Sequence, residues 1–178
     1  MRDSMFRARR AARRGRFRRF FPACGLRAFL FGAFFGGLSI QEDLGMYTHI
    51  QLGARDWPRL VAFYDVVLRP LGLTRCNGIE DAGPAGVIWR CGDRRWPSFV
   101  VAPPFNGLPA TWGNGCQVSF QAETCAAVRE CWNRAVELGG VDEGRPGLRP
   151  RYAPDFFAAY CRDPEGNKLA FVCSVATE

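Results

Sequence analysis

The sequence predicts an α+β fold: two tandem βαβββ modules that close into a cup-shaped mixed sheet, preceded by an Arg-rich N-terminal leader. The first observation is an internal repeat. The segment that begins at Thr48 matches the one that begins at Cys116, so His49 pairs with Gln117 and Leu52 pairs with Phe120. The second observation is that each copy runs from a short alternating strand into a helical stretch that ends at glycine. Neither copy could bury its sheet face alone, so we expect the two sheets to pack together.

The first module, about residues 46–103, begins with the strand pattern at Thr48. Asp56 or Trp57 caps the helix that follows, and Pro58 is tolerated in its first turn. An apolar stripe at helical spacing predicts this helix, formed by Leu60, Phe63, Val67 and Leu71. Three strand-like runs complete the module: Leu73–Cys76, Gly86–Cys91 and Ser98–Val101.

The second module, about residues 115–174, repeats this order after a glycine- and proline-rich joint at Pro103–Gly115. Thr124 is the expected N-cap of its helix, and Gly139-Gly140 end it. The helical stripe consists of Val128, Cys131, Ala135 and Leu138. Strand patterns follow near Val141 and at Phe156–Cys161 and Leu169–Ser174, with a second joint at Gly144–Pro154 and a hairpin turn at Asp163–Asn167.

The net charge of +7 lies in the leader, Met1–Gly45, which has ten arginines against three acidic residues. The body from Met46 to Glu178 has fourteen basic and fourteen acidic residues. A neutral body argues against a nucleic-acid-binding domain, which would carry its basic residues on a folded face. We therefore expect no nucleic-acid partner for the domain at residues 46–178.

The leader has three interpretations, which the sequence leaves open. It is a mis-assigned start with Met46 as the alternative, an export or membrane-surface leader, or an arm that binds RNA or phosphate. Its apolar run, Ala28–Ile40, is shorter than the roughly 20 residues that span a bilayer. The first interpretation predicts a cytoplasmic protein, and the second an exported or membrane-associated one. The eight cysteines include no C-x-x-C pair, which favours reduced thiols over a zinc ribbon.

The body resembles the vicinal oxygen chelate superfamily, which groups glyoxalases, bleomycin-resistance proteins and extradiol dioxygenases. The resemblance covers Tyr47 to about Ser174 and rests on four segments: HIQLGARDWPRLVAFYDVVLRPLGL, NGCQVSF, PGLRPRYAPDFFAAY and RDPEGNKLAFVC. It implies the cup fold but leaves the function open, because this superfamily performs several chemistries on one scaffold.

The resemblance also implies where a metal would bind, since relatives hold a divalent ion with up to four side chains. Two of these positions match His49 and Gln117. A third is normally Glu and falls at Ala170, and the fourth lies in Pro97–Ala102, which has no carboxylate, His or Cys. Two neutral ligands should bind a divalent ion weakly. We therefore expect no cofactor, with a divalent metal as the alternative.

His49 is the single histidine of the chain and the candidate catalytic residue. It could act as an acid or base, bind substrate, ligate a metal or hold a structural hydrogen bond. Gln117, at the symmetric position, could bind a ligand carbonyl or hydroxyl, or be satisfied by the backbone.

Four further residues are candidates for substrate binding. Arg149 could clamp a carboxylate or phosphate, and Tyr152 and Tyr160 could supply aromatic walls with a hydroxyl. Trp89 lies on a strand, where it either lines the cup or fills the core. A solvated arginine and ordinary core aromatics would give the same pattern.

The leading hypothesis is a glyoxalase/bleomycin-resistance-like protein that binds a small organic molecule in a cup with a degraded metal site. It would act by sequestration or by metal-independent chemistry. One alternative is a metal-dependent lyase or isomerase resembling lactoylglutathione lyase, and another is a non-catalytic domain tethered through its leader. Whether the protein is an enzyme stays open at this point. The expected partners are a small-molecule ligand, a second copy in a homodimer, and a membrane only if the leader is translated.

Overall fold

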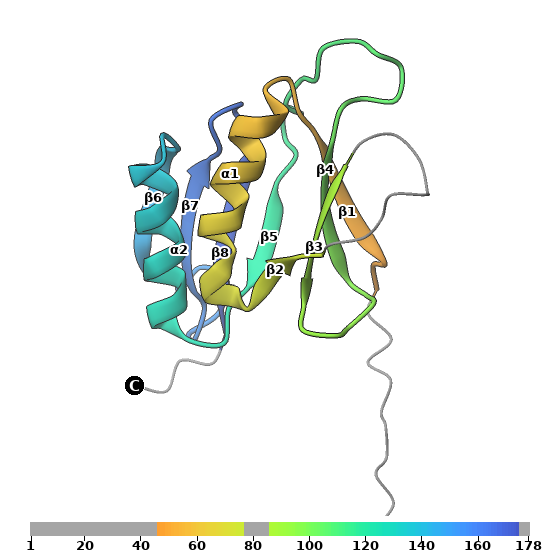
Figure 1. The fold of residues 1–178 in the computed structure, drawn as a ribbon. Helices are drawn as coiled ribbons and strands as arrows, with labels where there is room; N and C mark the ends of the chain where they lie inside the picture. Colours follow the sequence, from red (N-terminus) through yellow and green to blue (C-terminus); the bar gives the residue numbers. More distant parts are fainter. Residues whose placement is uncertain (1–45, 77–85, 175–178) are drawn as a thin grey trace, which may run out of the picture. The chain divides into compact units, whose positions relative to one another are not determined.

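The computed structural model describes residues 46–76 and 86–174. The chain divides into two units, and the second, Glu42–Glu178, contains every element described below (Figure 1). The predictions for the leader lie outside the described residues. In the described part of the chain, neither helix has the length and hydropathy that crossing a membrane requires.

Module one follows the predicted order of elements. Asp56 caps the first helix, because its side chain accepts a hydrogen bond from the Arg59 backbone N–H at 3.2 Å. Gly72, with φ of 72°, adopts the left-handed conformation that turns the chain into the next strand. The elements are β1 (His49–Gly53), α1 (Trp57–Val67), the short 3-10 helix η1 (Arg69–Leu71), β2 (Leu73–Arg75), β3 (Val87–Cys91) and β4 (Ser98–Ala102).

Module two repeats this order. Thr124 caps its helix by accepting a hydrogen bond from the Ala127 backbone N–H at 3.1 Å, and Gly139, with φ of 91°, follows the helix. The elements are β5 (Val118–Gln121), α2 (Cys125–Glu137), β6 (Val141–Leu148), β7 (Phe157–Arg162) and β8 (Lys168–Cys173).

Strand β6 is longer than the sequence pattern predicted. The sequence predicts a loop joint from Gly144, but residues 144–148 continue the strand, and Gly144, Gly147 and Leu148 pair with β7. The ladder shifts register at Asp142/Gly144 and again at Gly144/Gly147. Such irregularities break the alternation of side chains without ending the pairing, so the period-two pattern of the sequence does not identify this part of the strand.

The two modules build sheets of identical topology. Sheet A has the order β1-β4-β3-β2, and sheet B has the order β5-β8-β7-β6. In each sheet the first and last strands of the module pair in parallel and the other pairs are antiparallel. The predicted α+β fold of two tandem βαβββ modules is therefore confirmed.

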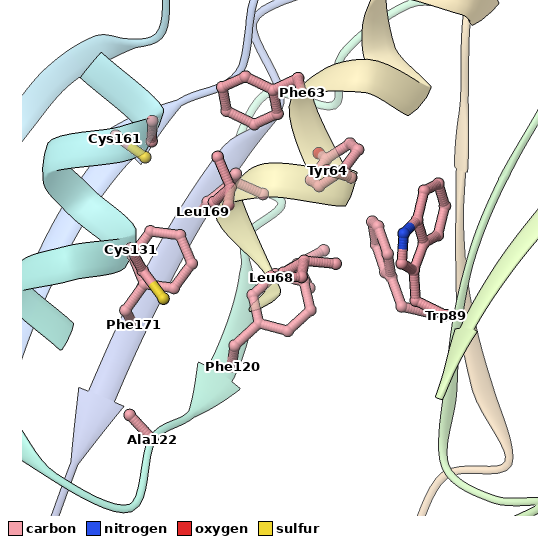
Figure 2. Close-up of a cluster of buried hydrophobic side chains, with 14 of the residues drawn as sticks. Phe63, Tyr64, Leu68, Trp89, Phe120, Ala122, Cys131, Cys161, Leu169 and Phe171 are labelled. Atoms are coloured by element: carbon pink, nitrogen blue, oxygen red, sulfur yellow. The ribbon is translucent and has the colours of Figure 1, made fainter. Parts of the chain in front are cut away.

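The two sheets share one hydrophobic core that contains α1. Tyr64 of α1 packs edge-on against Phe99 of sheet A, with ring centroids 4.8 Å apart. The Phe99 ring packs against Phe120 of sheet B with centroids 5.2 Å apart, and the Phe120 ring stacks on Phe171 with centroids 6.0 Å apart. Figure 2 shows α1 side chains between Trp89 on one side and Phe120 and Phe171 on the other. The modules are thus joined by apolar contacts that neither could make alone.

The turn between β7 and β8 also fastens module two to α1. Asp163 is 1% exposed and accepts a hydrogen bond from the Tyr64 hydroxyl at 2.7 Å. Glu165 accepts hydrogen bonds from the backbone N–H groups of Arg55 and Asp56 at 2.9 and 2.6 Å, immediately before α1. A carboxylate at this place satisfies N–H groups at the start of the helix and complements its dipole. The turn therefore sets where α1 and β1 lie relative to sheet B.

Candidate functional site

A pocket of about 570 Å³ opens between the two sheets, where β1 and β4 approach β5. One part of its wall is apolar and the rim carries polar side chains, which is the usual construction of a small-molecule site. The apolar part includes Leu71, Leu73, Phe99 and Phe120, and the polar part includes His49, Arg94, Ser98, Ser119, Gln121 and Glu123.

His49 lies at the start of β1, on the rim of this pocket. The side chain is exposed, and a hydrogen bond of 3.1 Å joins its Nδ1 to the Thr48 hydroxyl. The Trp96 ring lies beside it, with centroids 6.1 Å apart. The Nε2 atom has no partner among the described residues, so the imidazole can exchange a hydrogen bond or a proton with a bound molecule.

Gln117 lies just before β5, close to the pocket but outside its lining. Its side-chain amide donates a hydrogen bond to the Ser119 hydroxyl at 3.0 Å. Ser119 and Gln121 of β5 continue the alternation that begins at Gln117, and both are exposed and line the pocket. Sequence reasoning missed these two residues, although alternation along the strand from Gln117 was the signal that could have found them.

Arg149, directly after β6, lies beside Tyr160 of β7, and neither residue lines the pocket. The Arg149 guanidinium lies 5.7 Å from the Tyr160 ring centroid, and the Lys168 ammonium lies 5.9 Å from it. Arg149 also donates to two backbone carbonyls of β6, at 2.6 and 3.2 Å. Tyr152 is exposed and packs beside Phe156, with ring centroids 5.3 Å apart. None of these three predicted residues lines the pocket that His49 lines.

The structure places Trp89 in the core. The ring is fully buried, packs against Tyr64 and Phe99, and donates from Nε1 to Asp65 at 2.9 Å. It faces the helices, so of the two alternatives left open by the sequence it fills the core and does not line the pocket.

At the positions where members of the vicinal oxygen chelate superfamily hold a metal, the residues of this chain do not fit a divalent ion. Ala170 is fully buried beside Ser119 and Tyr160, and its methyl group cannot ligate a metal. Strand β4 supplies no carboxylate, histidine or cysteine. Among residues 46–76 and 86–174, no three His, Cys, Asp or Glu side chains converge as ligands. His49 and Gln117 leave a divalent ion short of the three or more ligands that it requires.

Solved structures share this fold. A glyoxalase/bleomycin resistance protein from Albidiferax ferrireducens T118 is 31% identical, with a TM-score of 0.59 over 72% of this chain and 98% of that chain. A glyoxalase/bleomycin resistance protein/dioxygenase family enzyme from Burkholderia phytofirmans PsJN is 18% identical, with a TM-score of 0.55 over 72% of this chain and 98% of its own. A lactoylglutathione lyase from Agrobacterium tumefaciens is 23% identical, with a TM-score of 0.50 over 75% of this chain and 98% of its own. No family model and no curated protein matches the sequence.

The fold and the pocket define a small α+β protein of paired βαβββ modules. The similarity to the Albidiferax structure extends over nearly the whole of that chain. This chain belongs to the glyoxalase/bleomycin resistance family of the vicinal oxygen chelate superfamily. The Burkholderia and Agrobacterium structures support the fold alone.

Proposed function

We propose that the protein binds a small organic molecule in the pocket between its sheets, and that it acts by sequestration or by chemistry that needs no metal. The observation that carries this proposal is the pocket of about 570 Å³, which combines an apolar wall with a rim of exposed polar side chains. A volume of this size lies in the range of ordinary ligand pockets, about 300–1,000 Å³.

In this proposal each part of the pocket wall has a different role. Leu71, Leu73 and Phe120 remove the apolar part of a ligand from water, which supplies most of the binding free energy. His49 and Gln121 at the rim can hold its polar groups and set its orientation. Sequestration needs only this binding. If the chemistry includes a proton transfer, His49 would act as its acid or base.

A metal-dependent lyase or isomerase is less well supported than metal-free binding. The likeness to the Agrobacterium lactoylglutathione lyase supports the fold alone, and the donors present at the corresponding position do not fit a divalent ion. The third alternative, a non-catalytic domain tethered through its leader, differs from ligand binding and from metal-dependent catalysis because it predicts that no small molecule enters the pocket.

The test is a thermal-shift screen of the full chain against small aromatic and aliphatic compounds, because a ligand of the folded state raises the apparent melting temperature. Glu123→Trp places an indole on the pocket wall and should abolish the shifts. Glu137→Trp, at the exposed end of α2, is the matched control and should keep them. Equal shifts in both variants, or none in the wild type, would contradict the proposal.

A second arm of the same screen adds zinc, nickel, manganese or iron salts without an organic compound. We expect no stoichiometric uptake by metal analysis. One equivalent of bound metal, lost in His49→Ala, would support the lyase or isomerase alternative instead.

A further inference from the structure

Four polar side chains stand in one line across sheet A. Thr74 pairs with Arg90 between β2 and β3, and His49 pairs with Ser98 between β1 and β4. The β3–β4 ladder pairs Trp89 with Phe99, so its next step places Arg90 opposite Ser98. Side chains that face each other across neighbouring strands have Cβ atoms about 5 Å apart. We call Thr74, Arg90, Ser98 and His49 the polar row.

The polar row faces away from the helices. Trp89 and Phe99 point into the core, and they alternate along their strands with Arg90 and Ser98. Successive side chains of a strand lie on opposite faces of the sheet, so Arg90 and Ser98 lie on the outer face. Ser98 and His49 also line the pocket, which connects that pocket to the row.

Two polar atoms of the row are buried without a partner among the described residues. Ser98 is 6% exposed, and its hydroxyl oxygen makes no hydrogen bond to any described residue. The Nε atom of the half-buried Arg90 makes none either. Leaving such groups unpaired costs stability, and a folded protein rarely carries two adjacent ones. Both atoms can donate a hydrogen bond, so an acceptor that approaches the row would satisfy them together.

We propose that the polar row binds an oxyanion, the carboxylate or phosphonate group of the molecule whose organic part occupies the pocket. This inference rests on the proposed function and names the chemical class of its ligand. The Arg90 guanidinium presents a planar fork that matches two oxygens of a carboxylate or phosphonate. The Ser98 hydroxyl donates from the neighbouring strand, and His49 joins this group to the pocket rim.

The experiment compares three probes of the same size on the full chain: benzoate, phenylphosphonate and the neutral benzyl alcohol. We expect the two oxyanions to bind more tightly than benzyl alcohol, by titration calorimetry or by chemical-shift changes. Addition of benzoate should shift the Arg90 Nε–H resonance, which is identified by its loss in Arg90→Met. A preference for benzoate over phenylphosphonate, or the reverse, identifies which oxyanion the row takes.

Arg90→Met should weaken benzoate or phenylphosphonate binding at least about tenfold, which is the usual worth of a hydrogen bond to a charged group. It should leave benzyl alcohol binding unchanged. Ser98→Ala should also weaken the oxyanions selectively. Arg151→Met, on an exposed loop of module two, is the matched control and should change neither.

The melting temperature of the unliganded protein distinguishes ligand binding from a structural role, because a structural role predicts that Arg90→Met and Ser98→Ala lower it. If the row exists to bind a ligand, Arg90→Met and Ser98→Ala should retain or raise the melting temperature, because each removes a buried unpaired atom. If Arg90→Met does not fold, Ser98→Ala carries the test alone.

If benzyl alcohol binds as tightly as benzoate and phenylphosphonate, the oxyanion site is contradicted, but the binding of a small organic molecule in the pocket is not. Both fail if none of the three probes binds. The proposal also fails if Arg90→Met changes the oligomeric state and keeps its affinity for benzoate, which would assign the row to an interface between copies.

Discussion

The β3–β4 turn of module one and the β7–β8 turn of module two hold equivalent positions in the repeat but have opposite surroundings. In module two, Asp163 is 1% exposed and Glu165 is 9% exposed. In module one, Asp93, Arg94 and Trp96 are all exposed. One copy of the turn is therefore a structural joint, whereas the other leaves its side chains exposed.

The buried turn is a dense network around one carboxylate. Asp163 accepts hydrogen bonds from the Tyr64 hydroxyl, from the backbone N–H groups of Glu165 and Asn167, and from the Asn167 amide, at 2.7–2.9 Å. Because Tyr64 belongs to module one, this network couples the two modules. A buried carboxylate is tolerated when its oxygens are satisfied in this way.

The exposed turn instead lies beside the candidate site. Arg94 lines the pocket, and Trp96 lies next to His49. The Arg95 guanidinium lies 5.4 Å from the centroid of the Trp96 ring. A duplicated hairpin can thus secure the fold in one module while its counterpart in the other module stays exposed beside the pocket.

The largest expected effect is the loss of the buried carboxylate. Asp163→Ala leaves a buried hydroxyl, an amide and two backbone N–H groups without an acceptor, so it should lower the free energy of unfolding by about 3–5 kcal/mol. Urea unfolding measures this change. The matched substitution Asp93→Ala, in the exposed turn, should change the same quantity by less than about 0.5 kcal/mol. Similar losses in the two variants would remove the contrast between the turns.

A smaller effect is expected at Tyr64, which contributes one of the four hydrogen bonds. Tyr64→Phe should lower the free energy of unfolding by about 1–2 kcal/mol near pH 7. Burial, and then the negative charge of Asp163, raise the pKa of Tyr64 well above its usual value. The folded protein therefore keeps this proton at a pH where the unfolded chain has lost it, and stability falls as pH rises above about 10.

The alkaline loss of stability has a second source in two buried thiols. Burial raises the pKa of Cys131 and of Cys161 to about 12. Their contribution to the free energy of unfolding therefore falls as pH rises above the pKa of a thiol in the unfolded chain. In urea unfolding at several alkaline pH values, Tyr64→Phe should show a shallower fall than the wild type above about pH 10. Parallel curves for the two proteins would contradict the assignment to Tyr64.

The smallest change in stability is expected in the exposed turn. Arg94→Ala should alter the free energy of unfolding by less than about 0.5 kcal/mol. It should weaken benzoate binding by up to about fivefold, the range for an exposed charge. Calorimetric titration checks this, with Arg151→Ala as the control of equal charge. A large loss of stability without any change in affinity would make the turn of module one structural as well.

Most of the fold could be predicted from the sequence, because its signals are local. Helical stripes, caps at Asp56 and Thr124 and the repeat itself are readable without tertiary structure. Strand β6 could not be delimited, since its register shifts depend on pairing with β7. The candidate site was predictable in part. His49 followed from the resemblance, but Arg90 becomes a candidate only when register places it opposite Ser98.

The two modules, the neutral charge of the body and the lack of a carboxylate at Ala170 follow from the amino-acid order. The tertiary structure was needed to show that Trp89 fills the core, that Asp163 reaches Tyr64 and that polar groups line up across sheet A. The physical reason is separation along the chain. Periodicity reports which face of an element is apolar, whereas register and packing between distant segments decide which side chains meet.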